Sequence, residues 1–599
     1  MGSHRIIKLK ESEEYSVRPW VTICALAIVT GLGGGVGAVL FRKMIDFFEW
    51  IFFSVVLSQT SILTLYGYNL GIIMLPVLCG LIIGPIILYF CPETKGHGVP
   101  EVMEAVHLQE GRIRKRVTAV KIFVSAATIG SGGSAGREGP IAQIGGSLGS
   151  TLAQLFKVDR ERSQLLTACG VAAGIAGTFN APLGGAFFGL EIILRRYKFK
   201  YIIPILIASS MGSWTTAAII GNRPAFQTTL FTLNFHQIEL LLFIIFGIAF
   251  GVISFLWVTC FYFIEGLFDR LKRIPDIFKP AIGMSIAGII GCILARHCTQ
   301  TLQIDFVSKY YGIMGAGYQG MDLALMGKLS LTMLLLLGVL KIIATSFTIG
   351  SGGSGGVFSP TLYIGTMFGL AIGYISQGIF PAIVTEPQVY GVIGMAALFA
   401  GTAKAPLTVI FQTPEMTRSF GLIPGLMIAC GFSYIVANIL LHGSSIYTLK
   451  LERRGTELRE GRIFKVKDAV KRKEKIEMVT EDMPLKEILK LVTNTNHFSY
   501  PMINRKEELS GVIRFNDIRR VLLEEEVYDL IIAKDIADSD LLTVTLEDRI
   551  EDALQKFILK DVTEIPVVKE GDPKTFLTML SRKDLLAIYD QEMQEREWD

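Results

Sequence analysis

A twenty-residue segment occurs twice in the chain, 220 residues apart. Residues 121–140 read KIFVSAATIGSGGSAGREGP and residues 341–360 read KIIATSFTIGSGGSGGVFSP, with eleven identical positions. A second match follows at an offset of 224, between AGTFNAPL at 176–183 and AGTAKAPL at 400–407. Two homologous halves, each with a glycine-rich break, predict a binding site where the halves meet.

Long apolar stretches recur along the first part of the chain. They are Val21–Leu40, Leu70–Phe90, Ile202–Ile220, Leu240–Phe263, Ile282–Leu294, Leu329–Ile343, Val389–Ala400 and Leu422–Leu441. Each is near the ~20 residues that cross a bilayer as a helix, or shorter. Gly and Pro interrupt many of them, which membranes tolerate where the backbone is buried in protein or lines a polar cavity. We predict a multi-pass α-helical membrane protein with broken helices and an internal two-fold repeat. We interpret the repeat as inverted, although similarity alone does not give its direction.

The charged residues divide the chain into two parts. Asp, Glu, Lys and Arg number 53 in residues 1–450 and 59 in residues 451–599, which indicates a membrane domain followed by a soluble one. In the tail, YPMI at 500–503 matches IPVV at 565–568, so we predict two similar α/β modules. We expect an N-terminal cytosolic segment at 1–17, a transmembrane domain at 18–446 with halves at about 18–220 and 221–446, a linker at 447–475, and modules at 476–535 and 536–592.

The composition argues against several classes of protein. The net charge is +4 and no basic run alternates with aromatics, so nothing supports nucleic-acid binding. The eight cysteines lack CxxC spacing, which favours apolar packing over a metal site or a disulfide framework. Basic clusters in short loops, such as Arg112–Arg116, are typical of the cytoplasmic side. We therefore expect an integral protein of the plasma or inner membrane with both termini in the cytosol.

Three Gly/Pro segments are candidates for anion binding: GHGVP at 96–100, GREGP at 136–140 and GVFSP at 356–360. Each is typical of a glycine-permitted loop followed by a helix start. A helix N-terminus offers unpaired N–H groups and about half a positive charge. Several such termini would bind a dehydrated anion without a lysine that could hold it too tightly. One segment alone could equally be a helix break without a ligand, but three in a repeat-symmetric membrane protein favour an anion site.

These segments resemble the signature motifs of the CLC family of chloride channels and chloride/proton exchangers. GREGP and GGVFSP match closely, and FNAPLGGAFFGLE at 179–191 and the tyrosine of GSSIY, Tyr447, also fit. The resemblance extends over residues ~20 to 590, because the family often ends in two CBS modules. It implies a homodimer in the lipid bilayer, with a separate anion pathway in each subunit. It also implies chloride as the ligand, no required cofactor and no enzyme activity.

By motif position, Glu138 is similar to the family's gating glutamate. A carboxylate at a helix N-terminus beside an anion site can occupy that site as a tethered anion, and protonation would release it. The alternative is a first-turn glutamate that stabilises a helix dipole. The anion-binding set that the resemblance implies is His97, Gly136, Arg137, Glu138, Gly139, Gly356, Val357, Phe358 and Tyr447. Val357 and Phe358 would act through backbone N–H groups. Tyr447 would act through its hydroxyl, with an interface-belt tyrosine as the alternative.

Two positions depart from the best-known exchangers of the family. His97 stands where chloride-selective members usually carry serine. It could donate a hydrogen bond to an anion, add charge when protonated, or pack away from the site, so the anion preference stays open. Ile192 stands where many exchangers carry a glutamate on the intracellular proton route, although some do without it. We therefore lean toward a channel or poorly coupled conduction, with a chloride/proton antiporter as the alternative.

Two further patterns have alternative interpretations. Ser581 and Asp584 resemble the S/T-x-x-D of nucleotide-binding CBS modules, which predicts an adenine nucleotide at the tail. The first module lacks the Ser or Thr, so dimerisation without ligand is the alternative. An intramembrane serine hydrolase, with Ser131 or Ser134 as nucleophile and His97 as base, is a remote alternative. It does not explain why GSGGS occurs in both halves.

Overall fold

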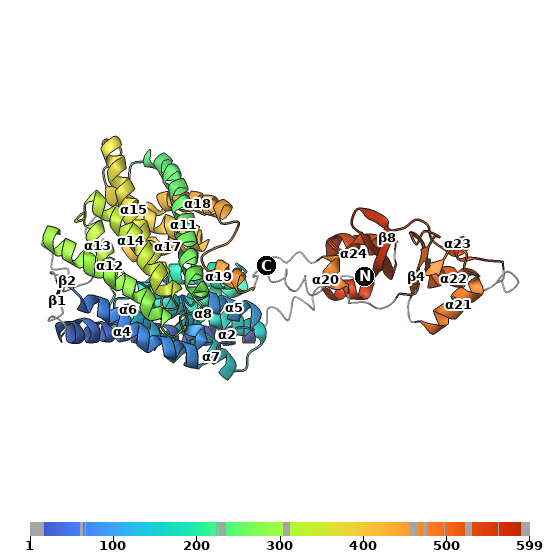
Figure 1. The fold of residues 1–599 in the computed structure, drawn as a ribbon, viewed down its shortest axis with the longest axis horizontal. Helices are drawn as coiled ribbons and strands as arrows, with labels where there is room; N and C mark the ends of the chain where they lie inside the picture. The colour runs from blue at the N-terminus through green and yellow to red at the C-terminus, as the bar shows by residue number, and fades with distance from the viewer. Residues whose placement is uncertain are drawn as a thin grey trace. The chain divides into compact units, whose positions relative to one another are not determined.

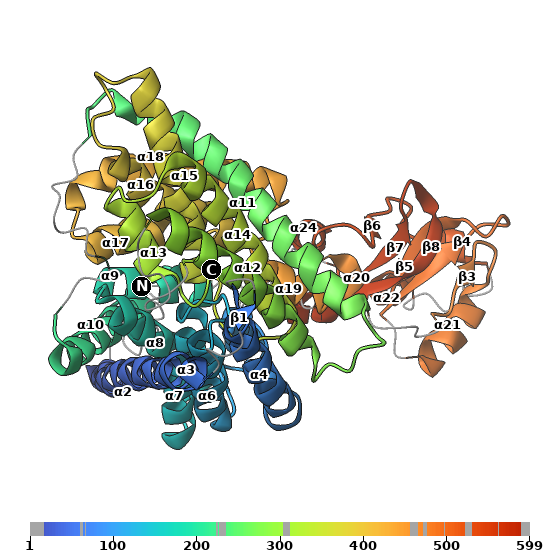
Figure 2. The same ribbon diagram turned by 60° about the vertical axis from the view of Figure 1, so that its left-hand side comes forward.

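The computed structural model describes residues 17–59, 64–65, 68–222, 226, 235–302, 312–455, 465–470, 476–495, 498–521, 530–560 and 562–588. The chain forms two compact units, Met1–Leu458 and Arg459–Asp599. In the first unit, the helices of the first half, coloured blue to cyan, lie against those of the second half, coloured green to orange (Figures 1 and 2).

The first unit is helical almost throughout, and many of its helices are short or interrupted. The first half contains α2 (Val17–Glu49), α4 (Gly71–Pro85), α5 (Val99–Leu108), α6 (Arg116–Gly130), α7 (Glu138–Leu155), α8 (Arg160–Phe179), α9 (Pro182–Phe187) and α10 (Phe199–Ile220). The second half contains α11 (Glu239–Arg270), α12 (Lys279–Leu302), α13 (Tyr318–Leu325), α14 (Leu331–Gly350), α15 (Phe358–Ile379), α16 (Pro387–Ala403), α17 (Pro406–Thr417), α18 (Ile423–Leu440) and α19 (Thr448–Arg453).

Eight of the described helices are long and apolar enough to cross a membrane. One of them, α15, lies outside the apolar stretches picked from the sequence, because polar residues and glycines are scattered among its apolar residues. The stretch Val389–Ala400 instead lies in α16, which has 17 residues and is shorter than the spanning helices. The prediction of a multi-pass helical membrane protein is confirmed.

Glycines let pairs of helix backbones touch in both halves. A methyl group at Gly145 of α7 would lie 2.1 Å from the carbonyl oxygen of Gly170 in α8. A methyl group at Gly365 of α15 would lie 2.5 Å from the carbonyl oxygen of Gly394 in α16. These pairs follow the sequence offsets of 220 and 224, so the repeat reproduces its helix packing. Small residues at such interfaces are the usual means of close helix association in membranes.

The second unit contains two three-stranded sheets with the same strand order. One is formed by β3 (Val479–Thr480), β4 (Ser499–Ile503) and β5 (Leu509–Arg514), and the other by β6 (Val544–Thr545), β7 (Glu564–Lys569) and β8 (Asp572–Ser581). In each sheet the first pair of strands is parallel and the second antiparallel. The helices α21 (Leu485–Asn494) and α24 (Ile550–Lys560) provide the parallel crossovers.

Chain order and packing differ in the second unit. The short helix α20 (Val466–Ala469) precedes the first sheet in sequence, yet Val466 lies in the apolar core of the second module. Its N–H donates to the carbonyl of Asp548 at 2.9 Å. Hydrogen bonds from Lys465 and Lys467 to Glu547 hold the pKa of that carboxyl low, at about 2.

The segment between the modules packs on the module that it follows. The short helix α23 (Ala533–Ile536) packs with Ala533 in the core of the first module. The second module is therefore completed by α20, which precedes the first module in sequence, whereas the first module is completed by α23, which follows it directly.

Candidate anion pathway

The three Gly/Pro segments meet at the boundary between the two halves. The N–H of Gly136 donates to the carbonyl of Gly356 at 2.7 Å, and the N–H of Gly356 donates to the carbonyl of Gly136 at 2.6 Å. A methyl group at Gly139 would lie 2.0 Å from the carbonyl oxygen of His97. Only glycine permits this close approach of three loops, so segments that are far apart in the sequence form one site.

Glu138 lies at the centre of this arrangement with its side chain fully buried. The N–H of Ser359, in the first turn of α15, donates to its Oε2 at 3.1 Å. The hydroxyl of Tyr318 donates to its Oε1, and the Arg137 Nε lies 3.8 Å from the same oxygen. The carboxylate is therefore held at the N-terminus of a helix from the other half, where partial positive charge favours an anion.

His97 and Tyr447 form a second part of the site. Both side chains are buried, and their ring centroids are 5.7 Å apart. Neither ring nitrogen of His97 has a hydrogen-bond partner in the described part of the chain. A buried polar group without a partner is costly, so this histidine indicates a place that a polar ligand or water fills.

Val357 is the N-cap of α15 and Phe358 is its first residue, and both side chains are buried. The Phe358 ring packs against the rings of Phe399 and Phe179, at 4.3 and 5.3 Å. Its side chain is thus part of an aromatic cluster. Any contribution of these two residues to anion binding comes from their backbone N–H groups, as the sequence motif predicts.

Two buried lysines at equivalent repeat positions hold the loops beside the site. Lys121 Nζ donates to the carbonyls of Thr94 and Gly96, both at 3.0 Å. Lys341 Nζ donates to the carbonyls of Ile313 and Gly315, at 2.9 and 3.0 Å. The lysine spacing is that of the sequence repeat, so the loop before α13 is the structural counterpart of the loop before α5.

The start of α13 is a part of the site that the sequence analysis missed. Gly98 and Gly317 are the N-caps of α5 and α13, with φ values of 84° and 87°. GHGVP and GAGYQ share only two glycines, too little to detect in sequence. A pair of glycines about 25 residues before each repeated lysine was the available signal.

Glu191 and Glu415 form a reciprocal pair of helix caps. Glu191 accepts hydrogen bonds from the N–H groups of Leu407 and Thr408, at 3.0 and 2.7 Å. Glu415 accepts from the N–H groups of Leu183 and Gly184, at 3.0 and 2.9 Å. Each glutamate thus caps the short helix of the opposite half.

Ile192 is buried in the apolar core directly after this cap. Glu191 is committed to α17 through its two carboxylate oxygens. It therefore points away from the proton-route position, as expected from the rotation of one residue along a helix.

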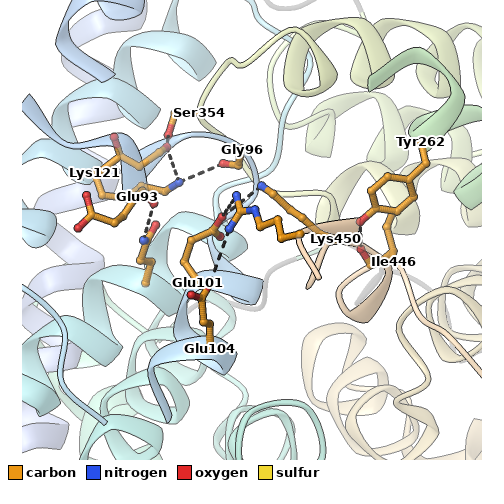
Figure 3. A network of polar contacts seen from close by, with 12 residues as sticks. Glu93, Gly96, Glu101, Glu104, Lys121, Tyr262, Ser354, Ile446 and Lys450 are labelled. Carbon is orange, nitrogen blue, oxygen red and sulfur yellow. Dashed lines mark hydrogen bonds and ion pairs between the residues drawn. The ribbon is translucent and has the colours of Figure 1, made fainter. Parts of the chain in front are cut away.

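An ion-pair network ties α19 to α5 (Figure 3). Lys450 Nζ lies 3.2 Å from Glu101 Oε1, and Arg454 lies 3.1 Å from the same oxygen. The Lys450 and Glu101 side chains are 7% and 8% exposed, so this pair is buried. The hydroxyl of Tyr262 donates to the carbonyl of Ile446. The residues before Tyr447 are thus held to α11, and those after it to α5, the helix that follows His97.

The hydrolase alternative finds no geometric support in the described residues. Ser131 Oγ donates to the carbonyl of Thr128 at 3.1 Å, and Ser134 Oγ pairs with Thr345 Oγ1 at 2.9 Å. Neither serine is hydrogen-bonded to His97, as a nucleophile and its base would be.

In the second unit, the hydroxyl of Ser581 donates to Asp584 Oδ2 at 2.7 Å and accepts from the Asp584 N–H at 3.0 Å. The two side chains thus form a local cap, and a nucleotide at this position stays a prediction.

Two related halves of membrane-spanning helices, with a buried carboxylate on helix N-termini at their boundary, define a membrane transport protein. Residues 79–438 match the family described as voltage gated chloride channel, and residues 466–524 and 533–590 match the CBS domain. The chain belongs to the voltage gated chloride channel family and carries two CBS domains. Its fold is therefore that of a CLC-type anion transport protein.

Curated relatives include H(+)/Cl(-) exchange transporters named ClcA. The protein of Vibrio parahaemolyticus is 31% identical over 447 residues, covering 73% of this chain and 90% of the relative. That of Vibrio cholerae is 33% identical over 367 residues, covering 61% of this chain and 75% of the relative.

Solved structures show the same fold. A slow cyanobacterial Cl-/H+ antiporter has a TM-score of 0.64 at 28% identity, over 72% of this chain and 97% of its own. A eukaryotic CLC transporter has a TM-score of 0.61 at 19% identity, over 95% of this chain and 99% of its own.

Proposed function

We propose that this chain exchanges chloride for protons across a membrane. The observation that carries the proposal is the buried Glu138 carboxylate, held by Tyr318 and the Ser359 N–H where the helix N-terminus favours an anion. The relatives named as exchangers support the antiporter alternative over the channel that Ile192 suggested. The missing carboxylate at Ile192 then requires that protons reach Glu138 by another route, such as a file of water.

The exchange follows from the competition of two anions for one position. The ionised Glu138 carboxylate occupies the donors at the start of α15 and excludes chloride. A proton neutralises the carboxylate, weakens its two hydrogen bonds, and allows it to leave. Chloride then takes the vacated donors, and Arg137 at the N-cap of α7 adds a positive charge nearby. His97 and Tyr447 would bind the anion further along the path, together with the backbone at Gly136, Gly139, Gly356, Val357 and Phe358.

The wild-type chain is expected to drive protons uphill when a chloride gradient is imposed. It is reconstituted in liposomes, with the membrane potential clamped by a potassium ionophore, and the internal pH is followed. Exchange predicts proton movement against its gradient in a fixed ratio to chloride. Chloride flux without proton movement, above the level of protein-free liposomes, would establish passive conduction instead.

We propose that His97 contributes to anion selectivity. His97→Ser is expected to change the chloride-to-nitrate flux ratio tenfold or more, since a hydrogen bond to a charged group contributes ~1.5–3 kcal/mol. The measurement is flux of each anion through liposomes at one pH. His236→Ser is the matched control, because His236 is exposed. An equal ratio in wild type and His97→Ser would make the histidine a packing residue.

We further propose a homodimer in the plasma or inner membrane, with the charged second unit in the cytosol. The family resemblance and the basic loop at 112–116 support this arrangement. The module limits 476–535 and 536–592 and the adenine-nucleotide site at Ser581 and Asp584 are proposals of the same kind. Cross-linking, protease access in sealed vesicles and nucleotide calorimetry test them.

A further inference from the structure

We propose that the Tyr318 hydroxyl is the side-chain donor of the anion position at the start of α15, where Glu138 lies. The hydroxyl donates to the Glu138 carboxylate there, and it donates to the transported anion once the carboxylate leaves. The proposal rests on the gating role of Glu138 in the proposed function. It adds a residue from α13, an element that none of the sequence motifs includes.

The position of Tyr318 is fixed by the second half of the protein. It is the first residue of α13, directly after the Gly317 N-cap. The loop before it is held by Lys341 through the carbonyls of Ile313 and Gly315. Because Lys341 is buried and lies within α14, the start of α13 is anchored to a membrane-spanning helix.

The ring of Tyr318 is held separately from its hydroxyl. The guanidinium of Arg137 lies over the ring, 4.5 Å from the centroid. The rings of Phe226 and Phe179 lie 5.6 and 6.5 Å from it. The ring is thus packed among these three side chains, and its hydroxyl donates to Glu138.

The hydroxyl makes a contact that depends on the charge of its partner. It donates to Glu138 Oε1, while the Ser359 N–H donates to Oε2 at 3.1 Å, so each carboxylate oxygen has one donor. A hydroxyl donates more strongly to an ionised carboxylate than to a neutral acid. The same two donors match a halide ion, which accepts hydrogen bonds and donates none. Tyr318 therefore favours whichever anion, tethered or free, occupies the position.

Several charged or titratable groups face Glu138 and shape its response to pH. Arg137 lies 3.8 Å away at the N-cap of α7. Lys341 on α14 and Tyr447 before α19 interact with its charge at longer range. The substitution Tyr318→Phe changes none of these charges, and it keeps the ring beneath Arg137. It removes the hydroxyl alone, which donates to Glu138 and also interacts with Arg137.

Tyr318→Phe is expected to move the pH midpoint of chloride flux to higher pH by about one to two units. The hydrogen bond from Tyr318 favours the ionised carboxylate. When the bond is lost, Glu138 is protonated at higher pH, and the anion position therefore opens at higher pH. Flux is measured in liposomes over a pH series for the full chain. Tyr374→Phe is the matched control: Tyr374 is half-buried on α15, sixteen residues and about 24 Å along the helix from Phe358.

A second comparison tests the contact with the free anion. In a Glu138→Gln background the gate carries no charge, so adding Tyr318→Phe is expected to weaken chloride binding severalfold in calorimetry. A pH profile of Tyr318→Phe that coincides with wild type would overturn the contact with the Glu138 carboxylate. Equal chloride affinity of the Glu138→Gln protein with and without Tyr318→Phe would overturn the contact with the anion. A Glu138→Gln protein that keeps its pH dependence would instead contradict the proposed function.

Discussion

Glu138→Gln is expected to conduct chloride at every pH and to lose proton coupling. Glutamine has nearly the shape of glutamic acid but carries no charge, so it mimics the protonated side chain permanently. The anion position at the start of α15 then stays open to chloride, and no group there can take up a proton. The flux ratio between acid and neutral pH should fall from an order of magnitude or more to about one.

The measurement is paired recording of chloride and proton flux from liposomes over a pH series. Glu110→Gln is the matched control, because the Glu110 side chain is 44% exposed and pairs at the surface with Arg112. It is expected to retain both the pH dependence and the coupling. A pH dependence retained in Glu138→Gln would show that another group is the gate.

Glu101→Gln is expected to destabilise the first unit by about 3–5 kcal/mol, the usual cost of leaving one partner of a buried ion pair uncompensated. Lys450 is 7% exposed and has Glu101 as its ion-pair partner. Without the Glu101 charge, water would therefore not solvate its buried ammonium group. Arg454 is 42% exposed and can turn outward. The stranded ammonium should loosen α19 and with it the position of Tyr447.

The effect is measured as a fall of several degrees in the unfolding temperature of the detergent-solubilised protein. Glu104→Gln is the matched control, since Glu104 is 29% exposed and its oxygen is 3.7 Å from Arg454. The double variant Glu101→Leu, Lys450→Met removes both charges and is expected to recover most of the loss. An unfolding temperature of Glu101→Gln equal to wild type would mean that water reaches Lys450.

Much of the first unit could be predicted from local rules. Apolar length and glycine or proline breaks are properties of short segments, so the spanning helices and the starts of α7 and α15 follow from sequence. Residue identities alone put residues 121–140 and 341–360 into correspondence. The helix α15 escaped the hydropathy pattern because serine, threonine and glycine residues interrupt its apolar residues.

Contacts between distant segments could not be predicted in this way. Glu191 and Glu415 share an offset, yet their exchange of caps between α9 and α17 needs the halves to be docked. In the second unit, α20 precedes the first module but packs in the core of the second, which strand and helix patterns do not encode.

The sequence alone therefore determined the membrane class, the two-fold repeat, the family and the identity of the central carboxylate. These depend on residue type and spacing along one segment. The tertiary structure decided that Tyr318 reaches Glu138, that Lys341 anchors its loop, and that His97 is left without a partner among the described residues. Those facts depend on which side chains of separate segments come within hydrogen-bonding distance, and only the packing of the two halves sets that distance.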